Sequence, residues 1–233
     1  MKQSEFDQHA ETYSDQHAKN IAVSGENPEF FAEYKVADAK RLTRESQVHR
    51  ILDFGSGIGN SIAYFRKHFD GGELFCADPS RRSLAIAAER FPGLERYVGI
   101  AEGARLDLPD GYFDLCFSAC VFHHIAHEQH RFWLEELRRV TRPGGMLVIF
   151  EHNPLNPLTV HAVNACPFDA NARLLTARKL AAAMRLAGWE PPKCEYRIFF
   201  PRLLASLRPL ERCLKKVPLG AQYSLSARRA THG

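Results

Sequence analysis

The chain has 233 residues, of which 45% are hydrophobic and 25% charged, and its formal net charge is +4. This length and composition fit one enzyme-sized domain over residues 1–233, and they exclude a fibrous, repetitive or low-complexity chain. The sequence has no apolar run long enough to cross a bilayer and no apolar N-terminal signal segment, so we expect a cytoplasmic protein.

Residues 1–48 precede the first predicted strand and are expected to form an N-terminal helical lid. Residues 51–60 then have the sequence Ile-Leu-Asp-Phe-Gly-Ser-Gly-Ile-Gly-Asn. Two apolar residues that can end a buried strand lead into Asp53 and three glycines, which predicts a sharp turn against a bound ligand. A dinucleotide fingerprint would need its third glycine at Asn60. The Asp53 carboxylate would repel a pyrophosphate but suits a ligand with a cationic amino-acid end.

A second acidic residue ends the next predicted strand. Residues 74–78 form a short apolar run that ends in Asp78. It follows the glycines by about 20 residues, the distance at which a strand–helix–strand unit returns an acid to ribose hydroxyls. A helix is expected after it, from its N-cap Ser80 to Arg90. Asp78 is therefore predicted to bind a ribose, and capping of the helix is the alternative.

The alternation of strands and helices continues to residue 150. Residues 97–102 predict a third strand and the turn that would meet an adenine, and residues 113–119 predict a fourth strand. Residues 128–140 carry apolar side chains at helical spacing and predict a covering helix. Within residues 142–150, a Pro-Gly-Gly turn precedes a continuous apolar strand of the kind that is buried on both faces.

These motifs, in this order, resemble those of the class I S-adenosylmethionine-dependent methyltransferases of the small-molecule kind, methyltransferase types 11 and 12. The resemblance covers about residues 48–150. It implies an α/β fold with a Rossmann-like, doubly wound sheet of seven strands, mostly parallel with one antiparallel strand, and helices on both faces. It makes residues 49–150 the cofactor-binding core and residues 151–233 the acceptor-side elements and C-terminal strands. A nicotinamide-dependent oxidoreductase and a non-catalytic cofactor-binding protein are the alternatives from other functional classes.

The resemblance also implies a cofactor site. It places S-adenosylmethionine against Tyr13, Asp53, Phe54, Gly55, Ser56, Gly57, Asp78, Pro79, Ala101, Glu102, Ser118 and Ala119. The glycines would pass under the cofactor, and Asp53 would lie near its methionine amino group. Because Ile100 stands where the family often has an acidic residue, adenine contacts are expected from the backbone around Ala101 and from Glu102.

Histidines are the candidate catalytic residues. Methyl transfer to a hydroxyl needs alignment, a partly dry pocket and a base, and the ordinary pKa of histidine suits a base. The candidates are His123, His124 and His152, with Glu151 as an alternative or an orienting partner. The expected reaction is O-methylation of a small molecule or glycoconjugate, and C-methylation of a quinone-like or lipid acceptor is the alternative. A nucleic-acid acceptor is disfavoured, because no Asn/Asp-Pro-Pro-aromatic motif follows the fourth strand.

The sequence predicts neither a metal site nor a disulfide. The six cysteines form no C-x-x-C pair, and three of them lie in or beside predicted buried strands, where cysteine behaves as a small hydrophobic residue. Four histidines lie close together at positions 123, 124, 127 and 130, but no acidic or thiolate pattern accompanies them.

The C-terminal region is the basic part of the chain, with nine Lys or Arg and three Glu in residues 189–233. Strands are predicted over residues 195–200 and 222–227, the second antiparallel. Between them, residues 199–216 carry leucines at helical spacing among basic residues, and Pro209 is expected to break or kink this helix. This stripe either packs on the domain, or it rests on a phosphate-bearing acceptor or an anionic membrane, which would place the protein at the inner membrane surface. The sequence gives no signal for an oligomeric state.

Overall fold

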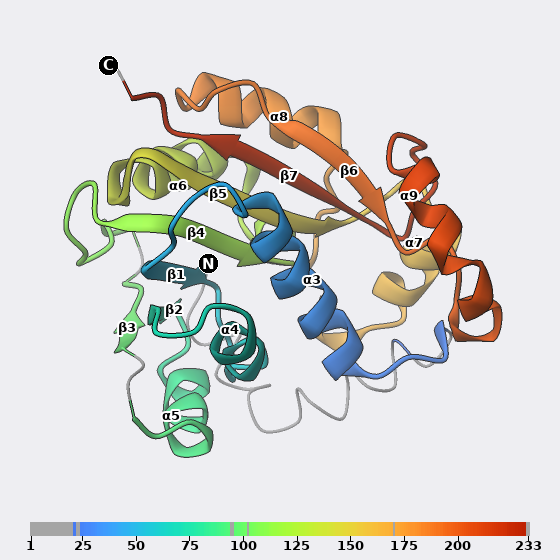
Figure 1. Ribbon diagram of the computed structural model, residues 1–233, viewed down its shortest axis with the longest axis horizontal. Coiled ribbons are helices and arrows are strands. Elements are labelled where there is room, and N and C mark those ends of the chain that lie inside the picture. The colour runs from blue at the N-terminus through green and yellow to red at the C-terminus, as the bar shows by residue number, and fades with distance from the viewer. Residues whose placement is uncertain (1–20, 22–23, 94–95, 102, 170, 232–233) are drawn as a thin grey trace.

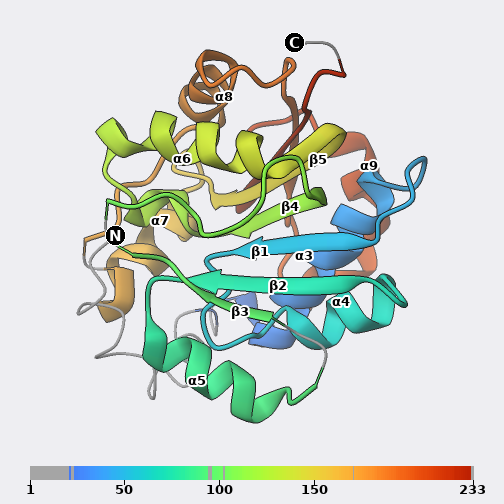
Figure 2. The same ribbon diagram turned by 90° about the vertical axis from the view of Figure 1, so that its left-hand side faces the viewer.

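The computed structural model describes residues 21, 24–93, 96–101, 103–169 and 171–231 (Figure 1). A seven-stranded sheet in the order β3-β2-β1-β4-β5-β7-β6 runs through this part of the chain. The strands are β1 (Arg50–Phe54), β2 (Glu73–Asp78), β3 (Arg96–Gly99), β4 (Phe113–Ala119), β5 (Thr141–His152), β6 (Lys193–Arg197) and β7 (Gln222–Arg228). Figure 2 shows β5, β4, β1, β2 and β3 side by side from top to bottom.

Among the described strands, β7 alone runs antiparallel to its neighbours, β5 and β6, whereas the pairs from β3 to β5 are parallel. The predicted doubly wound sheet, mostly parallel with one antiparallel strand, is therefore confirmed. In such a sheet the carboxyl ends of the parallel strands meet at one edge, where ligands bind.

Helices cover both faces of the sheet. They are α3 (Pro28–Leu42), α4 (Ile62–His68), α5 (Arg81–Arg90), α6 (His127–Val140), α7 (Pro157–Asn164), α8 (Ala177–Leu186) and α9 (Glu211–Leu214), with 3-10 helices η2 (Phe122–His124), η3 (Pro167–Asp169) and η4 (Arg202–Leu210). One apolar cluster joins α6 and α8 to the sheet, and a second joins α3, α4 and α5 to it. Because successive side chains of a strand point to opposite faces, Leu52 and Phe54 belong to the first cluster and Ile51 to the second. Asp53 thus points toward the side of α3 and α4.

Local sequence explains where several helices begin. The Asn27 side chain accepts a hydrogen bond from the Phe30 amide at 2.9 Å, and Pro28 follows it at the first helical position of α3. The Ser80 side chain accepts a bond from the Ser83 amide at 3.0 Å, which confirms the predicted N-cap of α5. These caps satisfy amide groups that have no partner inside the helix.

Two strand boundaries differ from the prediction. The Pro-Gly-Gly turn lies inside β5 rather than before it, as an irregularity between the pairs Phe113–Thr141 and Leu115–Met146. Strand β6 ends at Arg197, three residues before the predicted end at Phe200. Ile198 has a positive φ of 60°, which turns the chain out of the sheet at that point.

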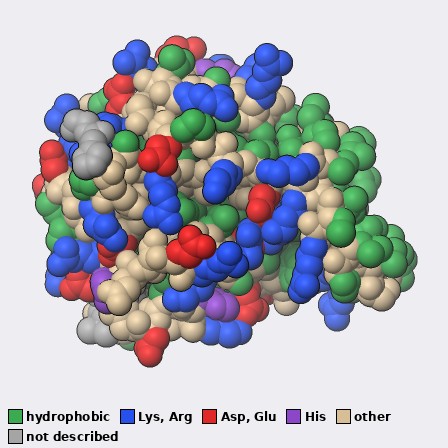
Figure 3. Space-filling view, turned by 45° about the horizontal axis from the view of Figure 1, so that its top comes forward, with side chains coloured by type: hydrophobic (Ala, Val, Ile, Leu, Met, Phe, Trp, Pro, Cys, Tyr) green, Lys and Arg blue, Asp and Glu red, His purple; other side chains and the backbone are tan. Residues whose placement is uncertain are grey.

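The segment with the leucine stripe projects from the domain. No residue of η4 or α9 is buried, and Leu203 is 93% exposed. Figure 3 shows hydrophobic side chains gathered on the projection at the right, where Figure 1 places α9. Among the described residues Leu203, Leu204, Leu207 and Leu210 are 39–93% exposed, while Arg208 joins the segment to the domain through an ion pair with Glu26. The 3-10 helix η4 ends at Leu210, one residue after Pro209, where a break or kink is predicted, and the non-helical residue inside it is Leu204.

None of the helices in the described ranges has both the length and the apolar character needed to span a bilayer.

Candidate functional site

A cavity of about 290 Å³ opens at the carboxyl ends of β1, β4 and β5. Of the predicted site residues, it is lined by Asp53, Gly55, Ser56, Gly57, Ala119, His123, His124 and His152. Helix α3 contributes Phe31 and Lys35 to its wall, and the chain after β6 contributes Phe199. The cavity therefore joins the predicted cofactor residues to the predicted catalytic histidines.

The glycine turn after β1 leaves room for a ligand. Gly55 has φ +80°, and a Cβ there would lie 2.3 Å from a methyl carbon of Val121, so the backbone passes this side chain too closely for any other residue. Gly57 has φ +53°, and a Cβ there would meet nothing within 4 Å. The first glycine is thus required by packing, whereas the second faces open space.

Asp78 holds the glycine turn in place. Its two carboxylate oxygens accept hydrogen bonds from the backbone amides of Gly57 and Ser80, both at 2.8 Å. The part of the cavity wall that the structure describes does not include Asp78. A carboxylate oxygen has a second lone pair, so the predicted contact with a ribose stays a prediction.

Asp53 is a buried acidic residue whose environment suits a cationic ligand. Its side chain is buried, and Oδ2 has no hydrogen-bond partner among the described residues. Burial raises the pKa of Asp53 to about 7, and Asp78 adds to the rise, while Ser61 and Lys35 lower it. Because a buried carboxylate without a partner is costly, this arrangement suits a bound ammonium group.

The other predicted cofactor residues are placed differently. Phe54 is fully buried and packs against Phe122 and Trp133 on the face away from the cavity, so only its backbone is near the turn. Ser118 is buried as well and does not line the described cavity, and neither do Pro79 and Ala101. Tyr13 and Glu102 lie outside the described residues.

A connected set of charged groups lies at the far wall of the cavity and behind it. Glu151 Oε1 accepts hydrogen bonds from the amides of Val121 and Phe122, at 3.0 and 2.7 Å. Its other oxygen, Oε2, lies 2.6 Å from Nδ1 of His123. Glu151 is fully buried and does not line the cavity, so it can act only through His123, as an orienting partner.

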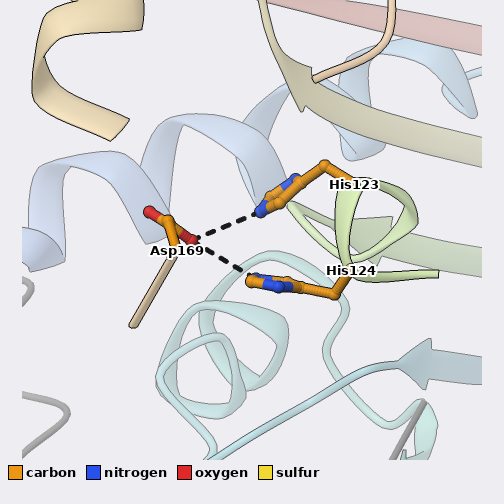
Figure 4. A group of neighbouring side chains, drawn as sticks. All are labelled: His123, His124 and Asp169. Atoms are coloured by element: carbon orange, nitrogen blue, oxygen red, sulfur yellow. Dashed lines mark ion pairs between the residues drawn. The ribbon is translucent and has the colours of Figure 1, made fainter. Parts of the chain in front are cut away.

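Asp169 of η3 meets both histidines of η2 (Figure 4). Its Oδ1 lies 3.5 Å from Nε2 of His123 and 3.3 Å from Nε2 of His124. Burial lowers the pKa of His123, but Glu151 and Asp169 outweigh it and raise that pKa to about 10. Burial and the neighbouring His123 lower the pKa of His124. His123 without a bound ligand is therefore a cation at neutral pH, and His124 is neutral.

A thiol that the sequence analysis did not select lies between these elements. Cys120 lines the cavity, and its Sγ is 3.4 Å from Nζ of the buried Lys35. Burial alone would raise the pKa of Cys120, but His152 and Lys35 lower it to about 6. Gln222 of β7 lies beside both groups, 3.8 Å from the thiol and 3.5 Å from Nδ1 of His152.

Only some of these missed residues had a signal in the sequence. Cys120 directly follows a predicted strand, a position at the ligand-binding edge. Lys35 belongs to the aromatic segment of residues 30–35, which could be expected to line a pocket from the sequence, although core or lid packing was the alternative. Asp169 had no such signal, because it comes from a 3-10 helix after the fifth strand.

The family comparison agrees with this geometry. Residues 52–149 match the family described as "Methyltransferase domain". The demethylmenaquinone methyltransferase of Thermus thermophilus is 36% identical over 115 residues, 48% of this chain and 51% of the relative. The malonyl-[acyl-carrier protein] O-methyltransferase of a Marinomonas species is 30% identical over 142 residues, 59% of this chain and 52% of the relative. The chain thus spans about half the length of the curated relatives it matches.

The fold recurs over the full length of a solved structure. A S-adenosylmethionine-dependent methyltransferase from Thermotoga maritima, described as a possible histamine N-methyltransferase, superposes with a TM-score of 0.71 at 19% identity and covers 97% of this chain and 99% of the other. Residues 52–149 are thus similar in sequence to the methyltransferase family, and the chain shares the fold of a S-adenosylmethionine-dependent methyltransferase. S-adenosylmethionine is the cofactor of this family.

Proposed function

We propose that this protein transfers a methyl group from S-adenosylmethionine to a hydroxyl oxygen of a small acceptor. The observation that carries the proposal is the single cavity that joins Asp53 to His152. Residues 24–35 contribute several groups to its wall, including Phe31 and Lys35, which supports the assignment of residues 1–48 as a lid over the site. Within this proposal, residues 49–150 hold the cofactor and residues 151–233 supply the acceptor side.

The described residues fit the methionine end of the cofactor. The unpartnered Oδ2 of Asp53 would bind the ammonium group of the cofactor, and the open space over Gly57 would let the cofactor approach the protein backbone there. When bound, S-adenosylmethionine supplies a methyl group on a positively charged sulfur, ready for in-line attack. The protein's remaining tasks are to align the acceptor, exclude water and remove a proton.

We assign proton removal to His152. The two ring nitrogens of His123 face the carboxylates of Glu151 and Asp169, which hold a proton on this ring rather than free it to accept another. His124 faces the same Asp169 oxygen. His152 also lines the cavity, and unlike His123 and His124 it is not paired with Glu151 or Asp169. As the acceptor oxygen bonds to the methyl carbon, the hydroxyl proton passes to His152 and the cofactor leaves as S-adenosylhomocysteine.

A quinol-type acceptor is the second candidate, and the names of the relatives favour it. Several relatives are ubiquinone or menaquinone biosynthesis C-methyltransferases, and one is an O-methyltransferase. Methylation at a ring carbon also begins with removal of a proton from a ring hydroxyl, so the same His152 would serve. The two reactions differ in which atom faces the sulfonium.

We further propose that the projecting segment rests on an anionic membrane, from which an apolar acceptor would enter. Leu203 and Leu210 are 93% and 55% exposed, and basic residues lie among them. The start of this segment, Phe199 and Pro201, lines the cavity, so a surface contact there is continuous with the acceptor side. Such a mix of exposed apolar and basic side chains is complementary to an anionic lipid surface.

Methyl transfer is tested with radiolabelled S-adenosylmethionine and a panel of phenols, quinols and polyprenyl-linked sugars. We expect the radiolabelled methyl group in a product formed from one of these acceptor classes. Mass fragmentation of that product then distinguishes O-methylation from C-methylation. His152→Gln should lower turnover at least tenfold without changing the affinity for S-adenosylhomocysteine, and the exposed His127→Gln is the control. Equal turnover in both variants would show that His152 is not the base. Absence of S-adenosylhomocysteine binding by the wild type would refute the proposed function.

Membrane contact is tested by co-sedimentation with phosphatidylglycerol vesicles at low and high salt. We expect binding at low salt, lost in Leu203→Asp and retained in Leu186→Asp, since Leu186 is an exposed leucine of α8 with 72% exposure. Binding would weaken at high salt because the screening length shortens. No binding of the wild type at low salt would refute the membrane proposal and leave the methyl-transfer proposal standing.

A further inference from the structure

Three ligand-type atoms converge at the acceptor side of the cavity. They are Nε2 of His123, Nε2 of His124 and an oxygen of Asp169, and all lie within 4.8 Å of one another. Figure 4 shows the two imidazole rings pointing toward the same carboxylate. All three residues line the cavity, so a group bound between them would face an acceptor.

The distances within this cluster are those of metal ligands rather than of strong ion pairs. A charge-assisted hydrogen bond between a ring nitrogen and a carboxylate is about 2.7–2.9 Å long. The two distances here are 3.5 and 3.3 Å, both to the same oxygen. Ligand atoms about 2.0–2.1 Å from a tetrahedral zinc ion lie about 3.4 Å apart. The two histidines offer nitrogens within 4.8 Å of each other, so a cation between the three atoms would fit once the side chains adjust around it.

The surroundings also resemble those of a metal site. Metal-bound histidines almost always give their second ring N–H to a carboxylate or carbonyl, which fixes the ring and its tautomer. Here Glu151 Oε2 lies 2.6 Å from Nδ1 of His123, and two backbone amides hold the opposite oxygen of Glu151. In a metal-bound state Nδ1 would keep its proton toward Glu151, and Nε2 would give up the proton that it holds toward Asp169. A divalent cation would then take the place of that proton between the ring nitrogen and the carboxylate.

We propose that His123, His124 and Asp169 form a binding site for a divalent cation of the zinc type. Two histidines and a carboxylate are a ligand set that catalytic zinc uses, with a fourth position left for water or substrate. In this protein that fourth position faces the cavity, where the acceptor's hydroxyl oxygen can take it. The cation would favour loss of the hydroxyl proton to His152, because it stabilises the negative oxygen. This role rests on the proposed function, whereas cation binding itself does not.

The test uses the full chain, freed of metal by dialysis against a chelator and titrated with Co²⁺, whose visible absorption reports a histidine and carboxylate environment. We expect one Co²⁺ per chain and its displacement by one equivalent of Zn²⁺. Asp169→Asn and His124→Gln should each weaken binding at least tenfold, whereas His127→Gln, an exposed histidine of α6, should not. Glu151→Gln should weaken binding about 10–100-fold, as loss of the group behind a metal-bound histidine does.

Two results would overturn the metal site. One is the absence of stoichiometric Co²⁺ binding by the wild type. The other is equal affinity of the wild type and Asp169→Asn, with circular dichroism showing that both are folded. Calorimetry with S-adenosylhomocysteine on the same metal-free samples separates the two proposals. A wild type that binds S-adenosylhomocysteine but fails to bind Co²⁺ rejects the metal site alone. A wild type that binds Co²⁺ but fails to bind S-adenosylhomocysteine rejects the methyl-transfer proposal alone.

Discussion

Replacement of Asp53 by Asn should make the protein without cofactor more stable and at the same time impair cofactor binding. Asp53 is buried, and its Oδ2 has no hydrogen-bond partner among the described residues. Asparagine keeps the size and the hydrogen-bonding oxygen of the side chain but has no charge to bury. The charge is thus expected to serve binding at the expense of stability.

The magnitude follows from the pKa of Asp53, which burial raises from 3.8 to about 7. A shift of about three units corresponds to about 4 kcal/mol. Because the pKa in the folded protein lies above that in the unfolded chain, the folded state holds more protons between the two values. The wild type therefore loses stability as the pH rises from about 4 to 7, and the loss is complete above pH 7. The stability advantage of Asp53→Asn should grow by about 3 kcal/mol between pH 5 and pH 8.

Urea unfolding of both proteins at pH 5 and pH 8 measures this difference directly. Calorimetry with S-adenosylhomocysteine at pH 8 should show at least about a tenfold loss of affinity in the variant, because a charge-assisted hydrogen bond is lost. The wild-type affinity should also rise from pH 6 to pH 8 as Asp53 ionises. A stability difference that does not change with pH, or an unchanged affinity of Asp53→Asn, would refute the reasoning.

The two glycines of the turn should respond differently to alanine. Gly55→Ala should lower the free energy of unfolding by more than about 1–2 kcal/mol, since it adds a clash with Val121 to the cost of a positive φ. Gly57→Ala should cost less stability but weaken S-adenosylhomocysteine binding, and equal stability loss in both would contradict the packing argument. Alkylation of Cys120 by iodoacetamide, followed by mass spectrometry of its peptide, should rise with pH and level off above pH 7, since its pKa is about 6. A midpoint above pH 8 would show that His152 and Lys35 do not lower the pKa of this thiol.

Much of the fold could be predicted from local patterns. Strand β4 has the predicted bounds, and Ser80 caps α5 as expected, because apolar runs and caps depend on residues close together in the chain. The bounds of β6 could not be found in this way. The apolar residues Ile198 to Phe200 continue a strand pattern, but the chain turns away at Ile198 and lines the cavity with Phe199. Ile198 and Phe199 thus line the cavity instead of continuing the sheet.

The sequence by itself predicted the resemblance to the methyltransferases, the order of the strands along the chain and the glycine turn with Asp53, since each rests on side chains within a few residues of one another. The tertiary structure decided which groups meet in the cavity. Asp169 reaches His123 and His124 from a loop beyond β5, and Lys35 reaches Cys120 from a helix before β1. It also decided their charge states, because burial and neighbouring charges shift the pKa of His123 and Cys120 in opposite directions. Neither convergence nor burial is encoded in the spacing of residues along the chain, because both depend on how distant segments pack against the sheet.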